Sequence, residues 1–315
     1  MIYKMKLNKF FFLFIIISFS FCNILNNYNS IYYLANNSKS HSLARVHFLS
    51  DNISGLFSHP LSKNVMSGDT YFSYLNQFNN SINIMQFGYC VVNNKKNNIS
   101  VGFINRKIND LNNTTESWSP LNHTDEPDFN EIDYNSINDL RYNNFGFLLS
   151  YNQYKKEKII NIKLKPYYES IQTMNSFGID LDFTLFIKFK NEINAIFGVN
   201  DLLSYKKWNN DLIEKNKLNY FVSTTVAIDN IELFIEANYL YDEKIGFQYE
   251  FDDILIFRFG SNANKNFYFG IGFNSEFAEL NYAYIPTNDY LGNINQLNLT
   301  LKLMGLRELK GKLKP

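Results

Sequence analysis

The chain has 315 residues, of which 45% are apolar and 17% aromatic, and its 30 basic and 30 acidic side chains cancel. This balance disfavours nucleic acid as a partner, because nucleic-acid-binding surfaces carry an excess of Lys and Arg. The 30 Phe and 22 Tyr residues suit strands, and aromatic rings also form the interfacial girdles of membrane barrels. Composition alone is equally compatible with a soluble, Tyr-rich β-sandwich.

Residues 1–22 have the pattern of a signal peptide. Lys4, Lys6 and Lys9 form a charged start, and an apolar run follows at 10–21. That run is shorter than the roughly 20 residues of a spanning helix. We expect cleavage after Cys22; lipidation of Cys22 is the alternative.

Residues 23–67 show no sustained period, and we expect them to form an N-terminal plug segment. A barrel of alternating strands is predicted over 68–304, followed by a polar tail at 305–315. The predicted strands are 70–76, 82–92, 99–106, 143–154, 159–168, 177–189, 193–200, 220–228, 231–241, 246–251, 254–260, 267–274, 277–285 and 296–304. Fourteen is an even number, as bacterial single-chain barrels require.

Two regularities predict a membrane barrel. Within 177–189, apolar residues alternate with mostly polar ones, which gives a strand one apolar and one polar face. The alternation slips near Met85 and Gln86, where a bulge would restore it. Every second connection is tight and polar, whereas the others include the long segments 107–142, 201–219 and 286–295.

Short turns on one rim and long loops on the other are typical of outer-membrane barrels. The sequence therefore predicts an all-β fold: a closed antiparallel transmembrane barrel of about fourteen strands with an N-terminal plug segment. Its expected location is the bacterial cell outer membrane, with outer-membrane lipid against its apolar face.

Charged residues fall on the polar faces of several predicted strands. Pairing the strands around 169–176 sets Lys165 opposite Asp180 and Lys163 opposite Asp182, and opposite charges across a ladder are stabilising. The other charges expected to face the lumen are Glu232, Glu236, Arg258 and Glu279. These groups either hold the plug or line a substrate path. Phe186, Phe234 and Ile256 either line an apolar pocket or pack on the plug.

The stretch 42–61 carries a family resemblance. Its plug motif consists of Asp51, Asn52, Gly55, His59, Pro60 and Leu61, of which Asp51, Gly55, Pro60 and Leu61 fit the family pattern and His59 stands where Asn is usual. Together with 101–118 and 269–286, this stretch resembles the PorV/PorQ-type branch of the FadL-like outer-membrane barrels. The resemblance implies a fourteen-stranded barrel whose N-terminal segment folds inward as a plug.

The residues offer no catalytic, cofactor or metal site. The four histidines, His41, His47, His59 and His123, lie outside the predicted strands, and no Ser–His pair or metal-ligand spacing occurs. We therefore expect a non-enzymatic barrel. The PorV/PorQ resemblance implies a role in protein secretion or surface assembly, with secretion-system proteins or exported cargo as partners. The alternative is a FadL-like transporter whose partner is a hydrophobic small molecule.

Overall fold

The computed structural model describes residues 31–78, 80–108, 112–113, 117, 132–140, 142–189, 192–239, 243–286 and 292–303. The expected signal peptide, the polar tail and His123 lie outside these residues. None of the described helices is both long and apolar enough to cross a membrane.

The described residues form one large antiparallel sheet. Its long strands are β1 (Thr70–Gln77), β2 (Ile82–Asn93), β3 (Asn97–Ile108), β6 (Tyr142–Lys155), β7 (Lys158–Ile171), β8 (Met174–Lys188), β9 (Ile193–Trp208), β11 (Asn219–Ile228), β12 (Ile231–Asn238), β13 (Lys244–Phe251), β14 (Leu255–Asn262), β15 (Phe267–Asn274), β16 (Ala278–Ile285) and β17 (Ile294–Leu301). The two-residue strand β10 (Ile213–Glu214) pairs with the end of β9, and β4 (Asn112–Asn113) pairs with β5 (Asn138–Asp139).

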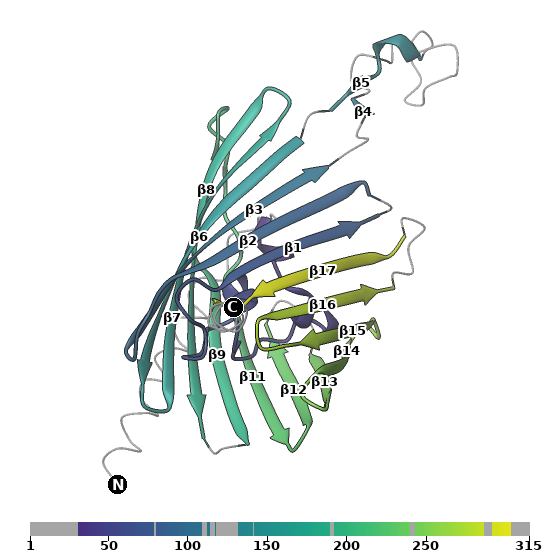
Figure 1. Ribbon diagram of the computed structural model, residues 1–315. Coiled ribbons are helices and arrows are strands. Elements are labelled where there is room, and N and C mark those ends of the chain that lie inside the picture. The colour runs from purple at the N-terminus through teal and green to yellow at the C-terminus, as the bar shows by residue number, and fades with distance from the viewer. Residues whose placement is uncertain are drawn as a thin grey trace, which may run out of the picture.

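The sheet closes on itself. Consecutive long strands pair with one another, β17 pairs with β1, and β8 pairs with β9, so that no long strand keeps a free edge. Leaving out the appended β10, the ring has fourteen strands, and the predicted closed antiparallel barrel is confirmed (Figure 1). Closure satisfies the backbone hydrogen bonds within the wall, which a bilayer cannot do.

The barrel wall is taller on one side. Strands β6 to β9 have 14 to 16 residues, whereas β12 to β17 have 8 each. In Figure 1 the tall side, with β6 and β8, rises above the rest of the ring.

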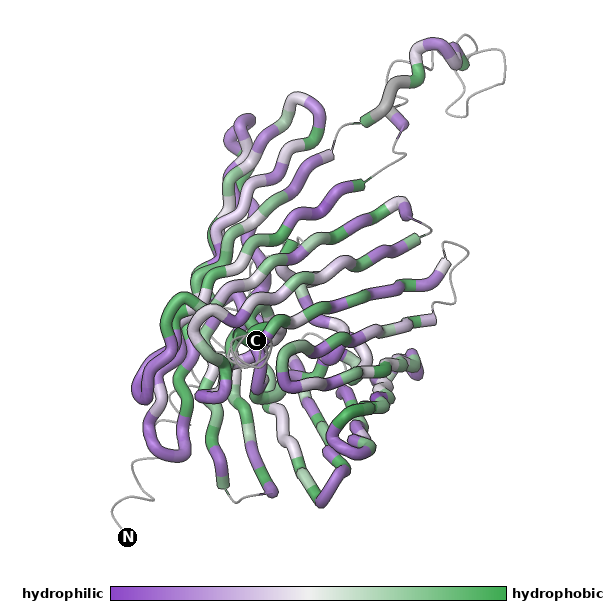
Figure 2. The backbone as a smooth tube through the Cα atoms, in the orientation of Figure 1, coloured by the Kyte–Doolittle hydropathy of each residue, from purple (hydrophilic) through white to green (hydrophobic). Residues whose placement is uncertain are grey.

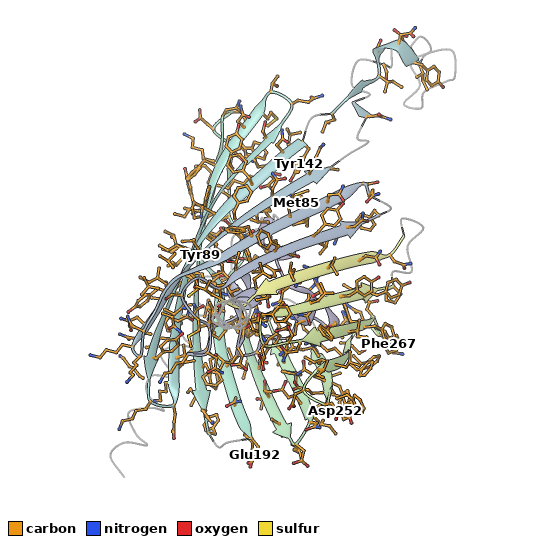
Figure 3. The ribbon with its side chains drawn as sticks, viewed as in Figure 1. Met85, Tyr89, Tyr142, Glu192, Asp252 and Phe267 are labelled. Carbon is orange, nitrogen blue, oxygen red and sulfur yellow. The ribbon has the colours of Figure 1, made fainter. Side chains whose placement is uncertain are left out.

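The outer face of the wall is apolar. Met85, Tyr89 and Phe267, labelled in Figure 3, are exposed and belong to a large set of exposed aromatic and aliphatic side chains that covers the strands. Along each strand these residues alternate with buried, mostly polar ones, and hydrophobic and hydrophilic residues alternate along the strands in Figure 2. This is the arrangement of a wall with lipid outside and polar protein inside.

Two details differ from the sequence-based expectations. The segment after Asn200 is not an outer loop: β9 continues to Trp208, and its frame shifts where it passes Asp182 of β8. The bulge in β2 lies between Cys90 and Val92, not at Met85 and Gln86.

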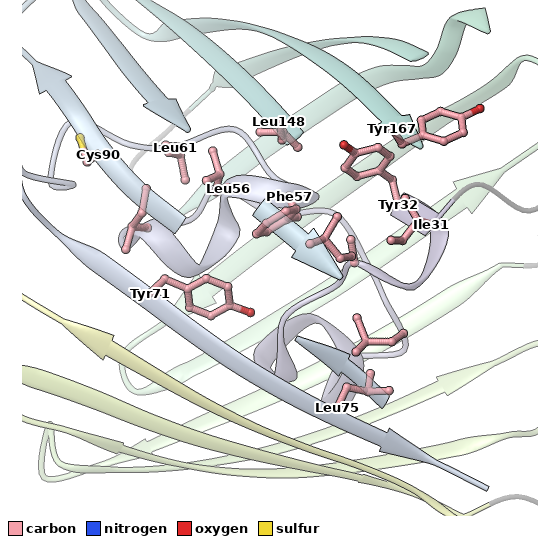
Figure 4. Close-up of a cluster of buried hydrophobic side chains, with 14 of the residues drawn as sticks. Ile31, Tyr32, Leu56, Phe57, Leu61, Tyr71, Leu75, Cys90, Leu148 and Tyr167 are labelled. Atoms are coloured by element: carbon pink, nitrogen blue, oxygen red, sulfur yellow. The ribbon is translucent and has the colours of Figure 1, made fainter. Parts of the chain in front are cut away.

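The N-terminal segment, residues 31–65, packs against the inner face of the barrel. It contains the 3-10 helix η1 (Ile31–Leu34), the short helix α2 (Ser38–Ser42) and the 3-10 helix η2 (Ile53–Phe57). The helix α2 contacts β14 to β17, whereas η2 contacts β1, β2 and β3. Apolar side chains of the segment and the wall form the largest buried cluster, shown in Figure 4.

Candidate functional site

The inner face of the barrel carries a set of buried charged side chains. The predicted lumenal residues Lys163, Lys165, Asp180, Asp182, Glu236, Arg258 and Glu279 are buried, and Glu232 is half-buried. A buried charge is costly unless it is paired or hydrogen-bonded. The partners of these groups therefore define what the interior holds together.

One group of charges joins β7, β8 and β9. The register sets Lys165 opposite Asp180 and Lys163 opposite Asp182. The ion pair that forms runs diagonally, with Lys165 Nζ 2.8 Å from Asp182 Oδ1 and 3.3 Å from Asp201 Oδ1. The backbone N–H of Asp201 also donates to Asp182 Oδ1 at 2.9 Å. Sequence reasoning missed Asp201, because the frame shift in β9 hides the strand there.

A second group joins β12 to β16 in a relay. Arg258 Nε donates to Gln248 Oε1 and Nη1 donates to Asn281 Oδ1, both at 2.7 Å. Gln248 Nε2 in turn donates to Glu232 Oε2, and Asn281 Nδ2 donates to Glu279 Oε1, both at 2.8 Å. The relay brings three of the predicted lumenal charges into one network.

Glu236 of β12 is the main polar anchor of the N-terminal segment. Its carboxylate accepts the backbone N–H of His47 at 2.7 Å and lies 2.8 Å from His47 Nδ1. Lys244 Nζ donates to the same carboxylate at 2.7 Å and to the Arg45 carbonyl at 3.1 Å. Ser223 Oγ donates to the His47 carbonyl at 2.6 Å.

Further hydrogen bonds attach other parts of the segment to the wall. They are Asn52 Nδ2 to Glu279 Oε2 at 2.6 Å, Gln296 Nε2 to the Asn36 carbonyl at 2.8 Å, Leu61 N–H to Asn152 Oδ1 at 3.1 Å, and Tyr154 Oη to the Ser62 carbonyl at 2.8 Å. Two of these wall residues, Asn152 and Tyr154, lie beside the tight turn between β6 and β7. The end of the segment is thus tied near the short-turn rim.

Glycines on the wall let the segment approach closely. A Cβ at Gly260 would lie 2.4 Å from the Ala44 nitrogen and 2.6 Å from the Leu43 carbonyl carbon, and one at Gly270 would lie 2.4 Å from Ser42 Cβ. Real side chains do not tolerate such contacts, so only glycine fits the segment at these positions. The wall is shaped to this segment.

Asn52, Gly55 and His59 of the predicted plug motif lie at η2. The Asn52 side chain caps η2 by accepting the Ser54 N–H at 2.9 Å, and the Gly55 carbonyl accepts the His59 N–H at 2.7 Å. His59 is fully buried and stacks on Phe48 at 4.0 Å between ring centroids. Burial, together with the positive charges of His47 and Lys163, lowers the pKa of His59 well below its usual value.

The remaining motif residues differ in exposure. Asp51 is exposed and accepts a hydrogen bond from Asn64 at 3.3 Å, whereas Leu61 is fully buried. The Pro60 carbonyl accepts the Ser50 N–H at 3.0 Å, which joins the two sides of the loop. Asp51 therefore does not face the wall charges.

His41 of α2 is buried and neutral. Its Nδ1 bonds to Gln296 Oε1 of β17, so that this nitrogen carries the proton. Burial, and next the positive charge of Arg45, lower the pKa of His41 to about 3. Within the described residues no three His, Cys, Asp or Glu side chains are grouped as a metal site.

The inward aromatic and aliphatic side chains pack on protein. Phe234 is buried beside Phe48, with ring centroids 5.7 Å apart, and Phe186 is buried in a cluster that Leu49 contacts. Ile256 is also buried. Of the two alternatives for these residues, Phe234 packs on the N-terminal segment, and Phe186 belongs to a cluster that packs on it.

A further polar cluster lies at the long-loop rim of the tall wall. Lys206 Nζ lies 2.6 Å from Glu169 Oε2 and 2.9 Å from Glu214 Oε2, and Tyr142 Oη donates to Glu169 Oε1 at 2.7 Å. Arg106 Nη2 is 3.7 Å from the same carboxylate. Sequence reasoning missed this cluster, because Lys206 and Glu214 fell in a predicted loop.

Comparison with known proteins supports the fold. No family model matches the chain, and the search of curated proteins found no match. The structure is similar to the Ralstonia pickettii toluene transporter TbuX, with a TM-score of 0.57, 8% identity, and coverage of 85% of this chain and 98% of that one. It is similar to the Pseudomonas putida toluene transporter TodX, with a TM-score of 0.55, 10% identity, and coverage of 88% and 97%. It is also similar to a Pseudomonas aeruginosa FadL homologue, with a TM-score of 0.50, 9% identity, and coverage of 85% of this chain and 98% of that one.

The apolar outer face, the polar inner face and the closed ring together define a transmembrane β-barrel of the bacterial outer membrane. Its fold is that of the FadL-like barrels, of which the structures named above are examples. These neighbours do not confirm the narrower PorV/PorQ assignment.

Proposed function

We propose that this barrel transports hydrophobic small molecules across the outer membrane and that residues 31–65 act as its plug. The likeness to toluene transporters supports the first part. The observation that carries the proposal is the fit of the segment to the inner wall, through Glu236 and the glycines Gly260 and Gly270. Since the segment covers inward aromatic side chains, passage requires it to move.

A disulfide lock tests this requirement. Leu43→Cys combined with Gly246→Cys places two Cβ atoms 3.1 Å apart, near the 3.5–4.5 Å typical of disulfides. Cells that carry the barrel in their outer membrane are given radiolabelled toluene. We expect uptake by the reduced variant, loss of uptake on oxidation, and recovery with dithiothreitol. The two single-cysteine variants are the controls.

Deletion of residues 31–64 provides the complementary measurement. The truncated barrel should still close and should show a larger conductance in planar bilayers, because the lumen loses its occupant. Unchanged conductance would contradict the plug assignment, and toluene uptake that does not respond to oxidation of the lock would contradict gating.

The second candidate is the secretion or surface-assembly role that the PorV/PorQ resemblance implies. It is supported by the N-terminal motif that includes Asp51, Gly55 and Pro60, whereas the three reported neighbours support transport. Co-purification of an exported protein with the barrel, without toluene uptake above that of cells lacking it, would favour secretion.

A further inference from the structure

Pro166 interrupts the ladder between β6 and β7. The two strands keep one register along their length, but the pairs of Phe147 with Pro166 and of Leu148 with Lys165 are missing. Pro166 is half-buried and lies on the outer face, between the buried side chains of Lys165 and Tyr167. A proline in the middle of a strand removes one ladder hydrogen bond, because it has no backbone N–H.

The group left without its ladder hydrogen bond is the Phe147 carbonyl. In an antiparallel pair, hydrogen-bonded and non-hydrogen-bonded positions alternate. Counting from the pair Lys155 and Lys158 at the two-residue turn, Phe147 and Pro166 stand opposite each other in a hydrogen-bonded position. The carbonyl of Phe147 therefore points at a ring nitrogen that cannot donate.

Tyr32 of the N-terminal segment supplies a replacement donor. Its hydroxyl donates to the Phe147 carbonyl and lies 2.8 Å from the Pro166 carbonyl. Its ring meets that of Tyr167 edge-on, with centroids 6.1 Å apart, and Figure 4 shows the two rings side by side. A residue more than 100 positions away in the chain thus completes this part of the wall.

The wall has a recess for this hydroxyl. A Cβ at Gly146 would lie 2.3 Å from Tyr32 Oη and 2.8 Å from Cζ, so a larger residue at 146 would expel the ring. On the other side Lys165 Nζ lies 5.5 Å from the centre of the Tyr32 ring, a distance that allows a cation–π interaction. The glycine, the proline and the tyrosine together form one fitted contact.

We propose that Tyr32 is a structural part of the barrel wall and that the seating of the N-terminal segment closes the seam between β6 and β7. When the segment leaves, the Phe147 carbonyl loses the Tyr32 hydroxyl and finds no N–H opposite it in the ladder. A carbonyl without a hydrogen-bond donor is costly inside a bilayer. Strands β6 and β7 then separate more easily at Pro166 than elsewhere. This coupling does not depend on what the barrel transports.

Hydrogen exchange of the full barrel in lipid nanodiscs tests the proposal. Tyr32→Phe removes only the hydroxyl, and we expect the peptides covering 145–150 and 164–168 to exchange about tenfold faster, whereas those of β14 and β15 keep their rates. Tyr71→Phe is the matched control, because the Tyr71 hydroxyl donates to the side chain of Gln86 and not to the wall backbone. It should leave the β6–β7 peptides unchanged.

A rescue variant makes the test specific. Pro166→Val restores the missing N–H and places an apolar side chain on the outer face, so in the Tyr32→Phe background it should return the β6–β7 exchange rates to wild-type values. Wild-type rates in Tyr32→Phe alone would overturn the proposal, and so would fast exchange that persists in the double variant. Migration of unheated samples on gels shows that each variant has closed as a barrel.

Discussion

Gly260 is the position where the fit between wall and segment can be tested most directly. In Gly260→Ala the new Cβ would meet the Ala44 nitrogen at 2.4 Å, the Leu43 carbonyl carbon at 2.6 Å and Leu43 Cα at 2.9 Å. All three are backbone atoms, which cannot rotate away as a side chain can. Overpacking of this kind costs about 1–3 kcal/mol. Because the strain disappears when the segment leaves, the unseated population should rise roughly 5- to 150-fold.

Cysteine labelling measures that population. Ser42→Cys, in a Cys90→Ser background, places a thiol at a buried position of the segment, and its reaction rate with a maleimide reports unseating. The matched control is Gly246→Ala. Gly246 faces Gly260 across the ladder, but its Cβ would only approach the Leu43 side chain at 3.1 Å. Equal labelling rates in the two alanine variants would refute the reasoning.

Three further predictions concern the wall and the segment. Leu181→Arg should impair folding into vesicles by about 2–4 kcal/mol, because it places a charge in lipid, whereas Leu181→Phe should be tolerated; equal losses in the two variants would contradict the assignment of Leu181 to the outer face. Exchanging Lys165 and Asp182 should recover at least about 0.5 kcal/mol of the stability lost in either single charge reversal, as a double-mutant cycle of denaturation would show; additive losses would exclude coupling. Lowering the pH from 7 to 5 should weaken seating, with about 2 kcal/mol coming from His41, because His41 is neutral when buried but binds a proton when released, and its pKa falls from 6.5 to about 3 on seating; a labelling rate at Ser42→Cys independent of pH, or a pH effect undiminished in His41→Gln, would contradict this.

The sequence predicted the strands well because the membrane imposes a period of two on them. Lipid outside and polar protein inside select opposite side chains at successive positions, as 177–189 illustrates. The rule weakens where the inner face is apolar as well. Ile84 and Ile104 point inward and are fully buried against the N-terminal segment, so the alternation around Met85 resembled a slip although the strand is regular there.

The contacts inside the barrel could be predicted only in part, because they depend on where strands bend. Counting along the hairpin of β7 and β8 gave the register of Lys165 and Asp180, since a tight turn fixes which residues stand opposite each other. It could not give the contact of Lys165 with Asp201, since the frame shift of β9 brings Asp201 beside Asp182. A frame shift adds extra residues to one strand, and the local sequence pattern does not predict where. The same limit applies to Tyr32: Pro166 marks a carbonyl without a donor, but only the folded chain shows which residue supplies one.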